Sequence, residues 1–244
     1  MHTVARIVWD VVIYRLRRRE MANLLAAVTV LLAVGASWTS AAVRLSFAVL
    51  LNVLVYLTND YYDVDADLQE GSKAPAKAGY LRQHMPQARG AQYLLLVILL
   101  IISGLWGHGL LMTLALAAGL CWAYSARLKR MPGVDLLVIF ACGVTSAMTA
   151  FPLDRTLGWV LAGQLGLFAA AFQTVQMLRD RGPDARFGTS TTAVHLGDTA
   201  TVWLHRALLL VSAIYATLLV NRWINLAILL APLLPVRVNK ADRH

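Results

Sequence analysis

Apolar residues gather into long runs along the chain, and polar segments separate these runs. A membrane-spanning helix needs about 20 mostly apolar residues in succession. Eight runs approach this length, and the last is the weakest because it is short and contains Pro232 and Pro235. The runs cover residues 21–40, 43–60, 91–107, 109–125, 134–152, 157–178, 200–220 and 222–237. The pattern predicts an all-α polytopic membrane bundle of about eight transmembrane helices, in one domain over residues 1–244.

The segments between the runs are of two kinds. Very short turns are expected at Thr39–Val43, Gly107–Gly109, Pro152–Thr156 and Asn221–Arg222. Longer polar segments cover residues 59–90, 126–133 and 179–199. Of the 22 Lys and Arg residues, 19 lie at the chain ends, in the long segments or at the start of the seventh run, and only Arg44, Arg155 and Arg222 lie at short turns. Because cytoplasmic loops carry the excess of Lys and Arg, both termini and the long segments are expected in the cytoplasm of a bacterial inner-membrane protein.

The amino-acid composition also indicates that much of the protein surface faces lipid. Hydrophobic residues make up 59% of the chain and charged residues 14%, whereas a soluble domain has about 25% charged residues. The net charge of +9 is spread over the chain ends and several separate loops rather than one basic stripe, so no nucleic-acid partner is expected, and no obligate protein partner is evident. Cys121 and Cys142 lie inside apolar runs without paired spacing, which predicts neither a disulfide framework nor a zinc site.

A first group of polar side chains closes the second run. Asn59, Asp63 and Asp67 are spaced by four residues, so they share one face of a helix. Asn52 and Tyr56 extend this face into the membrane. Aligned carboxylates repel each other unless cations lie between their oxygens, and Mg²⁺ typically binds one or two carboxylates together with substrate phosphates. The spacing therefore predicts a magnesium site.

A second group follows the sixth run. Asp180 and Asp184 repeat the four-residue spacing. Gly182 and Pro183 are expected to end or bend the helix between them. Three arginines among these acids favour an anionic ligand.

A basic segment, Tyr124–Arg130, closes the fourth run on the same predicted side of the membrane. Two carboxylate groups and one basic group that face each other would bind a metal-bridged diphosphate. The metals neutralise the phosphates, while Lys129 and Arg130 stabilise the charge that builds on the leaving group.

Taken together, these segments resemble motifs of the UbiA superfamily of intramembrane prenyltransferases. The first resembles the family's NDxxDxxxD motif and reads Asn59-Asp60-x-x-Asp63-x-x-x-Asp67. The second resembles its DxxxDxxxG motif and reads Asp180-x-x-x-Asp184, followed by Gly188, Thr191, Val194 and Leu196-Gly197. The basic segment resembles its YSxxLKR motif and reads Tyr124-Ser-x-x-Leu128-Lys129-Arg130. The resemblance covers about residues 45–200, with the motifs in the family's order.

The resemblance implies a helical bundle around a central cavity that opens laterally to the lipid bilayer. Such enzymes bind a prenyl diphosphate through Mg²⁺ and ionise it to an allylic carbocation. The cation then alkylates an aromatic or other lipophilic acceptor.

The resemblance also implies a role for each matching residue. Asn59, Asp63 and Asp67 would hold one magnesium ion, and Asp180 and Asp184 the other. The catalytic residues would be Asp63, Asp180, Lys129 and Arg130, of which the two basic residues grip the diphosphate. Further contacts to the diphosphate and its metals would come from Asp60, Tyr124, Arg127 and Arg181. Asp60 and Asp65 would either orient the metal ligands or be solvated, and Asn52, Tyr56, Gln173 and Gln176 would either line the cavity or form hydrogen bonds between helices.

Three departures from the family pattern concern the acceptor end of the cavity more than the diphosphate site. Family members commonly have nine spans rather than eight. Lys73 and Lys77 stand where the loop usually carries an Arg-Pro-rich stretch, and the first helix lacks the usual Arg-Pro entry.

Three other functions compete with prenyl transfer. A terpene cyclase on the same scaffold would ionise the diphosphate and cyclise its chain without an external acceptor. A phospholipid-type alcohol phosphotransferase would need an Asp-Gly-x-x-Ala-Arg element, which the sequence lacks. A divalent-cation carrier would place carboxylates near the middle of the membrane rather than at helix ends.

Overall fold

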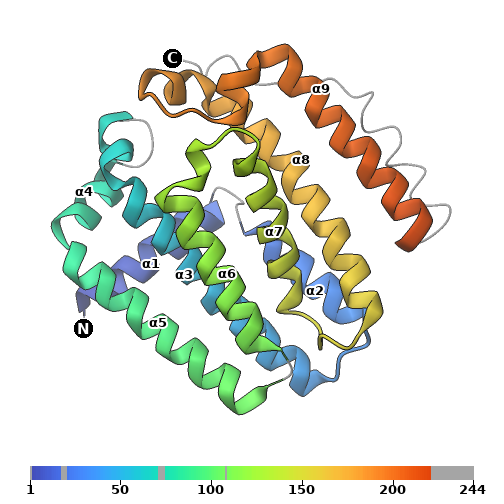
Figure 1. Cartoon of the computed structure of the whole chain (residues 1–244). Coiled ribbons are helices and arrows are strands. Elements are labelled where there is room, and N and C mark those ends of the chain that lie inside the picture. The colour runs from blue at the N-terminus through green and yellow to red at the C-terminus, as the bar shows by residue number, and fades with distance from the viewer. Residues whose placement is uncertain (1, 18–20, 71–74, 108, 221–244) are drawn as a thin grey trace. The chain divides into compact units, whose positions relative to one another are not determined.

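The computed structural model describes residues 2–17, 21–70, 75–107 and 109–220, and these residues form helices and turns without a strand (Figure 1). The α-helices are α1 (His2–Arg17), α2 (Ala22–Ala33), α3 (Trp38–Glu70), α4 (Pro75–Gln83), α5 (Met85–Trp106), α6 (Leu110–Ala126), α7 (Val134–Met148), α8 (Thr156–Arg186) and α9 (Thr192–Tyr215). A short 3-10 helix, η1 (Leu128–Arg130), precedes α7, and a π-helical turn, η2 (Ala216–Val220), continues α9. The all-α prediction is confirmed.

Seven of the predicted apolar runs coincide with apolar helices. Four stretches are long and apolar enough to cross a membrane, namely Trp38–Asp65, Met85–Trp106, Thr156–Arg186 and Thr192–Val220. Three shorter apolar helices cover Leu24–Ala33, Leu110–Ala126 and Val134–Met148. The eighth run, 222–237, lies outside the described residues, so the count of about eight spans stays a prediction.

The chain divides into two compact units, which are considered separately below. Unit 1 comprises Met1–Ala126 and Thr145–Gly158, and unit 2 comprises Arg127–Val144 and Trp159–His244. Unit 1 contains α1 to α6 and the end of α7, whereas unit 2 contains η1, most of α7 and α8, and α9. The single domain expected from the sequence stays a prediction.

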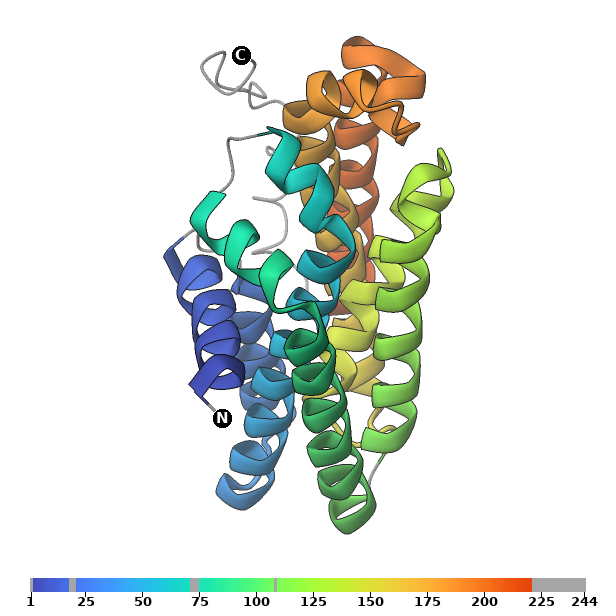
Figure 2. The same cartoon turned by 90° about the vertical axis from the view of Figure 1, so that its left-hand side faces the viewer.

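Unit 1 is built around α3. This helix has 33 residues, and at a rise of about 1.5 Å per residue it is roughly 50 Å long, well beyond the hydrocarbon thickness of a bilayer. It contacts α1, α2, α4, α5 and α6, and Figure 2 shows α1, in dark blue, and α4, in turquoise, beside it. The core around it contains Phe47, Leu57, Leu99 and Leu110, whose side chains are fully buried.

Two helices of unit 1, α1 and α4, were not expected from the apolar runs. Both are short and amphipathic: α1 buries Ile7 and Val11, one turn apart, and α4 buries Ala78 and Leu81. A narrow apolar stripe is enough to hold such a helix against a neighbour, but it does not form a continuous apolar run. The polar segment predicted for residues 59–90 is therefore largely helical.

The predicted turn at Thr39–Val43 is wrong, because α3 already begins at Trp38. Arg44, which was expected beside that turn, has a relative exposure of only 1%. Its guanidinium donates hydrogen bonds to the main-chain oxygens of Thr149, at 3.2 Å, and Phe151, at 2.9 Å. These carbonyls lie in the turn that follows α7, beyond the helix itself. Arg44 thus satisfies main-chain oxygens of a buried turn instead of serving as a loop charge.

Unit 2 packs through small residues and short polar contacts. A Cβ atom at Gly166 of α8 would lie 2.9 Å from the main-chain oxygen of Phe140 in α7, so the two backbones approach closely only because a side chain is missing. Between α8 and α9, the Gln164 amide donates to the Ser212 hydroxyl at 2.5 Å, and the Tyr215 hydroxyl donates to a main-chain oxygen at 3.0 Å. Hydrogen bonds of this kind are typical of helix contacts in membranes.

Candidate active site

The first motif lies near the carboxyl end of α3. The helix is continuous to Glu70, so Asn59, Asp63 and Asp67 lie on successive turns of one face, as the spacing predicts. With a rise of about 1.5 Å per residue, Asn59 lies roughly 32 Å and Asp67 roughly 44 Å from the start of the helix. The carboxylates therefore lie toward one end of the spanning stretch and not near its middle.

Asp60 is the most buried polar residue of the first motif, with a relative exposure of 3%. Its carboxylate pairs with Arg15 of α1 at 2.5 Å and with Lys77 of α4 at 2.6 Å. The Arg15 guanidinium lies 4.6 Å from the centre of the Tyr56 ring, and the Lys77 ammonium lies 4.1 Å from the centre of the Tyr14 ring. Asp60 is thus one buried carboxylate between two cations that rest on aromatic rings. Of the two alternatives for this residue, solvation is wrong, because Arg15 and α4 cover it.

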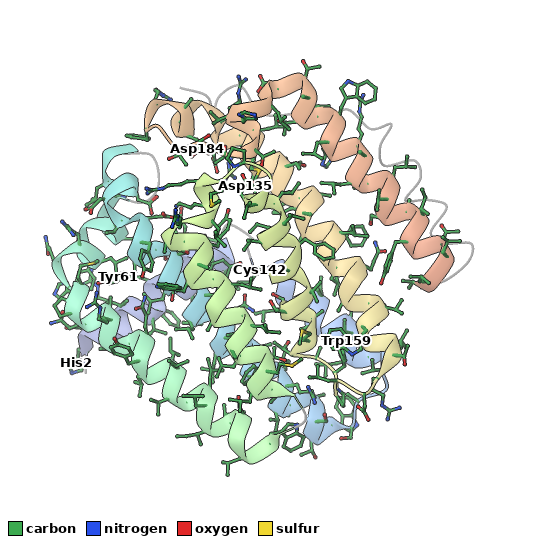
Figure 3. All side chains as sticks on the ribbon, in the orientation of Figure 1. His2, Tyr61, Asp135, Cys142, Trp159 and Asp184 are labelled. Carbon is green, nitrogen blue, oxygen red and sulfur yellow. The ribbon has the colours of Figure 1, made fainter. Side chains whose placement is uncertain are left out.

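The two tyrosines after Asp60 fix α3 to two further helices. Arg89 of α5 donates to the Tyr61 hydroxyl at 2.7 Å, and the Trp122 indole of α6 donates to the Tyr62 hydroxyl at 2.8 Å. Figure 3 labels Tyr61 on this part of the helix. Successive residues of an α-helix point about 100° apart. Tyr61 and Tyr62, which lie between the predicted metal ligands, therefore anchor α3 to its neighbours on other faces than the one that carries Asn59, Asp63 and Asp67.

The basic motif begins in unit 1, where it meets the first motif. The Ser125 hydroxyl of α6 donates to the Asn59 side-chain oxygen at 3.5 Å. Tyr124 precedes Ser125 and is half-buried. Of the proposed lining residues, Asn52 donates to the main-chain oxygen of Ala48 at 3.0 Å, within its own helix.

The second motif lies on one uninterrupted helix, contrary to the expectation of a break at Gly182 and Pro183. α8 runs through Pro183 to Arg186. Pro183 lies in the last turn, where the donor that it lacks removes only one hydrogen bond of the helix. Asp180 and Asp184 therefore lie one turn apart on the same helix, which strengthens the four-residue spacing as a site feature.

Two of the arginines in the second motif form ion pairs with carboxylates. Both oxygens of Asp180 accept from the guanidinium of Arg179, at 2.9 and 3.0 Å. Arg181 pairs with Asp198 at 2.8 Å. A carboxylate has about four lone-pair positions, so Asp180 keeps acceptor capacity for a metal while Arg179 orients it.

Sequence reasoning missed Asp135, a fully buried carboxylate in the first turn of α7. It accepts hydrogen bonds from the main-chain N–H and the hydroxyl of Thr192, the first residue of α9. The neighbouring Thr191 hydroxyl donates to Asp184 at 3.4 Å. Figure 3 labels both Asp135 and Asp184. A single acid at the start of an apolar helix, after a glycine, was the available signal.

Of the remaining basic residues, Lys129 and Arg130 lie in η1 and Arg127 directly precedes it. Arg127 and Arg130 are exposed and Lys129 is half-buried. These three residues and the second motif lie in unit 2, whereas Tyr124 and the first motif lie in unit 1. That the two aspartate motifs face each other across one cavity stays a prediction.

The donor set fits magnesium bound together with a substrate. Among the residues that the structure describes, no group of three or more His, Cys, Asp or Glu side chains is placed to hold a metal ion. Each motif instead offers two carboxylates, with an asparagine oxygen added in the first. Mg²⁺ characteristically binds one or two carboxylates and completes its octahedron with water and substrate phosphates.

Comparison with known proteins gives the fold and the family. The structure of a UbiA homolog from Archaeoglobus fulgidus, bound to GPP and Mg²⁺, matches with a TM-score of 0.76 and 16% identity, over 95% of this chain and 84% of that one. No protein with a curated description matches. The family model of the UbiA prenyltransferase family matches residues 21–240. The chain, an integral membrane protein by its long apolar helices, therefore belongs to the UbiA prenyltransferase family.

Proposed function

We propose that the protein is a Mg²⁺-dependent membrane prenyltransferase, which transfers a prenyl group from an isoprenyl diphosphate to an aromatic or other lipophilic acceptor. One observation carries this proposal. Both aspartate motifs lie toward the ends of helices long enough to span a membrane, α3 and α8. Carboxylates at such ends reach the polar boundary where a diphosphate group remains solvated while its chain enters the apolar interior. A cation carrier would need them near the middle of the membrane.

The metal ligands proposed for this chain are its oxygen donors on the two helices. Asn59, Asp63 and Asp67 would hold one magnesium ion, and Asp180 and Asp184 the other. When bound, magnesium neutralises diphosphate charge and so makes diphosphate a better leaving group. The homolog from Archaeoglobus fulgidus, whose structure contains GPP and Mg²⁺, supports this assignment.

The basic residues would act on the leaving group. The carbon–oxygen bond of the allylic diphosphate breaks, and both bonding electrons leave with the diphosphate. Lys129 and Arg130 donate hydrogen bonds to the oxygens on which this negative charge builds. Tyr124, Arg127 and Arg181 add further donors around the same group. The resulting allylic cation bonds to a nucleophilic carbon of the acceptor, which then loses a proton.

The charge distribution supports a cytoplasmic opening for the site. Arg44 is buried inside a helix, so it no longer counts as a charge at a short turn. Only Arg155 and Arg222 remain among the basic residues of the predicted short turns. The remaining Lys and Arg residues lie mainly at the chain ends and in the polar segments that carry the aspartate and basic motifs. By the positive-inside rule these segments would be cytoplasmic.

Product analysis tests the proposal. Purified protein in detergent would be incubated with Mg²⁺ and prenyl diphosphates of C10 to C20, with and without a panel of aromatic and lipophilic acceptors. We expect a prenylated acceptor by mass spectrometry, and release of diphosphate only when an acceptor is present. A cyclic hydrocarbon formed from the diphosphate alone would contradict the transferase and identify a cyclase on the same scaffold. Absence of any Mg²⁺-dependent consumption of diphosphate would contradict both.

A further inference from the structure

Asp135 is a charged side chain with no exposure to solvent, although it lies outside the motifs discussed above. Its carboxylate accepts from the main-chain N–H of Leu136 at 2.8 Å, from the main-chain N–H of Thr192 at 2.7 Å, and from the Thr192 hydroxyl. The donors come from the first turn of α7 and from the first residue of α9. Helix amino termini carry unsatisfied N–H groups and partial positive charge, so two of them together stabilise a buried carboxylate.

Thr192 extends this contact to the turn that follows the basic motif. Its hydroxyl oxygen accepts a hydrogen bond from the main-chain N–H of Gly133 at 2.7 Å while the hydroxyl proton is donated to Asp135. Gly133 has a φ of +81° and ends the turn that follows Leu128–Arg130. The turn that follows the basic segment is therefore fastened to the start of α9.

The start of α9 also holds the end of the second motif. The Thr191 hydroxyl accepts from the Val194 N–H at 3.4 Å, as a helix cap, and donates to the Asp184 carboxylate at 3.4 Å. The main-chain oxygen of Asp184 accepts from the N–H of Thr189 at 2.8 Å. Of these two adjacent threonines, Thr192 thus contacts Gly133, in the turn after the basic segment, and Thr191 contacts Asp184. All these residues belong to unit 2.

We propose that Asp135 and Thr192 are positioning residues, which hold the basic segment 127–130 and Asp184 in one fixed geometry for the diphosphate and its metal. The proposal rests on the function proposed above. Groups that act on one ligand gain from being fixed before it binds, since no ordering is then required on binding. Thr191 alone already caps α9, so the Asp135–Thr192 contact adds a connection between segments rather than a missing cap.

Three variants of α9 test the proposal by ligand binding rather than by turnover. Thr192→Val removes the hydroxyl and keeps the shape of the side chain, whereas Thr192→Ser keeps the hydroxyl. The matched control is Thr201→Val. Thr201 is also buried on the same helix, but its hydroxyl donates to the Gly197 oxygen one turn earlier, within α9. Binding of a non-hydrolysable C10 prenyl thiolodiphosphate would be measured by calorimetry in detergent over a Mg²⁺ titration, together with the unfolding temperature.

We expect Thr192→Val to weaken Mg²⁺-dependent binding of the analogue by about 10-fold or more and to raise the Mg²⁺ concentration at half-saturation, because residues that orient metal ligands typically contribute 10- to 100-fold in affinity. Thr192→Ser and Thr201→Val should stay within about twofold of the wild type. Equal binding by Thr192→Val and Thr201→Val would overturn the inference and leave the proposed function intact. Wild-type protein that binds no analogue in Mg²⁺ would overturn the proposed function, and this inference with it.

A second variant keeps the inference testable if Thr192→Val yields no folded protein. Thr191→Ala cuts the side-chain contact with Asp184 but leaves Asp135 and Thr192 in place. It should raise the Mg²⁺ concentration at half-saturation in the same direction, and because it also removes the α9 cap its unfolding temperature should fall below that of Thr201→Val. An unchanged Mg²⁺ titration would overturn the connection between α9 and Asp184.

Discussion

The two aspartate motifs are held in place by different interactions. In unit 1, the first motif is fixed by long polar side chains: Asp60 pairs with Arg15 and Lys77, which come from two amphipathic helices. In unit 2, the second motif is fixed by short side chains and helix ends, through Thr191, Thr192 and a buried acid. Removing one partner of a buried ion pair strongly lowers the free energy of unfolding. A single hydrogen bond from a hydroxyl or main-chain group contributes only modestly to it. We therefore expect the two units to respond differently to single substitutions.

The largest effect on stability is expected from Asp60→Asn. The substitution keeps the shape but leaves the cations of Arg15 and Lys77, with side chains 13% and 15% exposed, without their carboxylate. The free energy of unfolding in detergent should fall by about 3 kcal/mol or more.

The matched control for this substitution is Asp65→Asn, on the same helix. Asp65 also pairs with a residue of α4, Arg82 at 3.3 Å, but these side chains are 63% and 54% exposed. An exposed pair contributes less than about 1 kcal/mol. Equal losses for the two variants would show that burial of Asp60 does not anchor the first motif.

A smaller loss is expected from Gly143→Ala in unit 2. The new methyl group would lie 2.9 Å from the backbone at Gly166 and Leu165, so α7 and α8 would have to separate. Overpacking of this kind costs about 1–3 kcal/mol, measurable by denaturant unfolding in detergent. Gly119→Ala on α6 is the control, because its methyl group meets open space and replacing a helical glycine should stabilise by about 0.5–1 kcal/mol. If both variants gained stability, close packing of α7 on α8 would be contradicted.

The smallest expected effect is a gain from Gly182→Ala. Gly182 lies inside α8 with nothing near the position of a methyl group. A continuous helix should gain about 0.5–1 kcal/mol from the better helix former. A loss of stability in the same unfolding assay would instead mean that the chain needs a glycine there, and that α8 breaks between Asp180 and Asp184.

Much of the fold was predictable because a helix that spans a lipid bilayer needs a long run of apolar residues. Long apolar runs gave the positions of α2, α3 and α5 to α9, and the four-residue spacing gave the face that carries Asn59, Asp63 and Asp67. Hydropathy could not reveal α1 and α4, since amphipathic helices bury only a narrow stripe. The turn expected before Arg44 was wrong because a buried guanidinium can be satisfied by the carbonyls of a distant turn.

The contacts that hold the two aspartate motifs in place were harder to predict than the motifs themselves. Asp60 and Arg15 are 45 positions apart, and Asp135 and Thr192 are 57 positions apart. Neither distance repeats with a helical period, so only the packing of helices brings these partners together. Pro183 was expected to break α8, but a proline in the last turn of a helix removes too little hydrogen bonding to end it.

The central claim is that two aspartate motifs act together on one prenyl diphosphate. It is tested most directly by Mg²⁺-dependent release of inorganic diphosphate from a prenyl diphosphate, in the presence of acceptor, by the wild type, Asp63→Ala and Asp180→Ala. Each variant should release diphosphate about 100-fold more slowly or worse, while its unfolding temperature stays near that of the wild type. Wild-type release by either variant would contradict the claim.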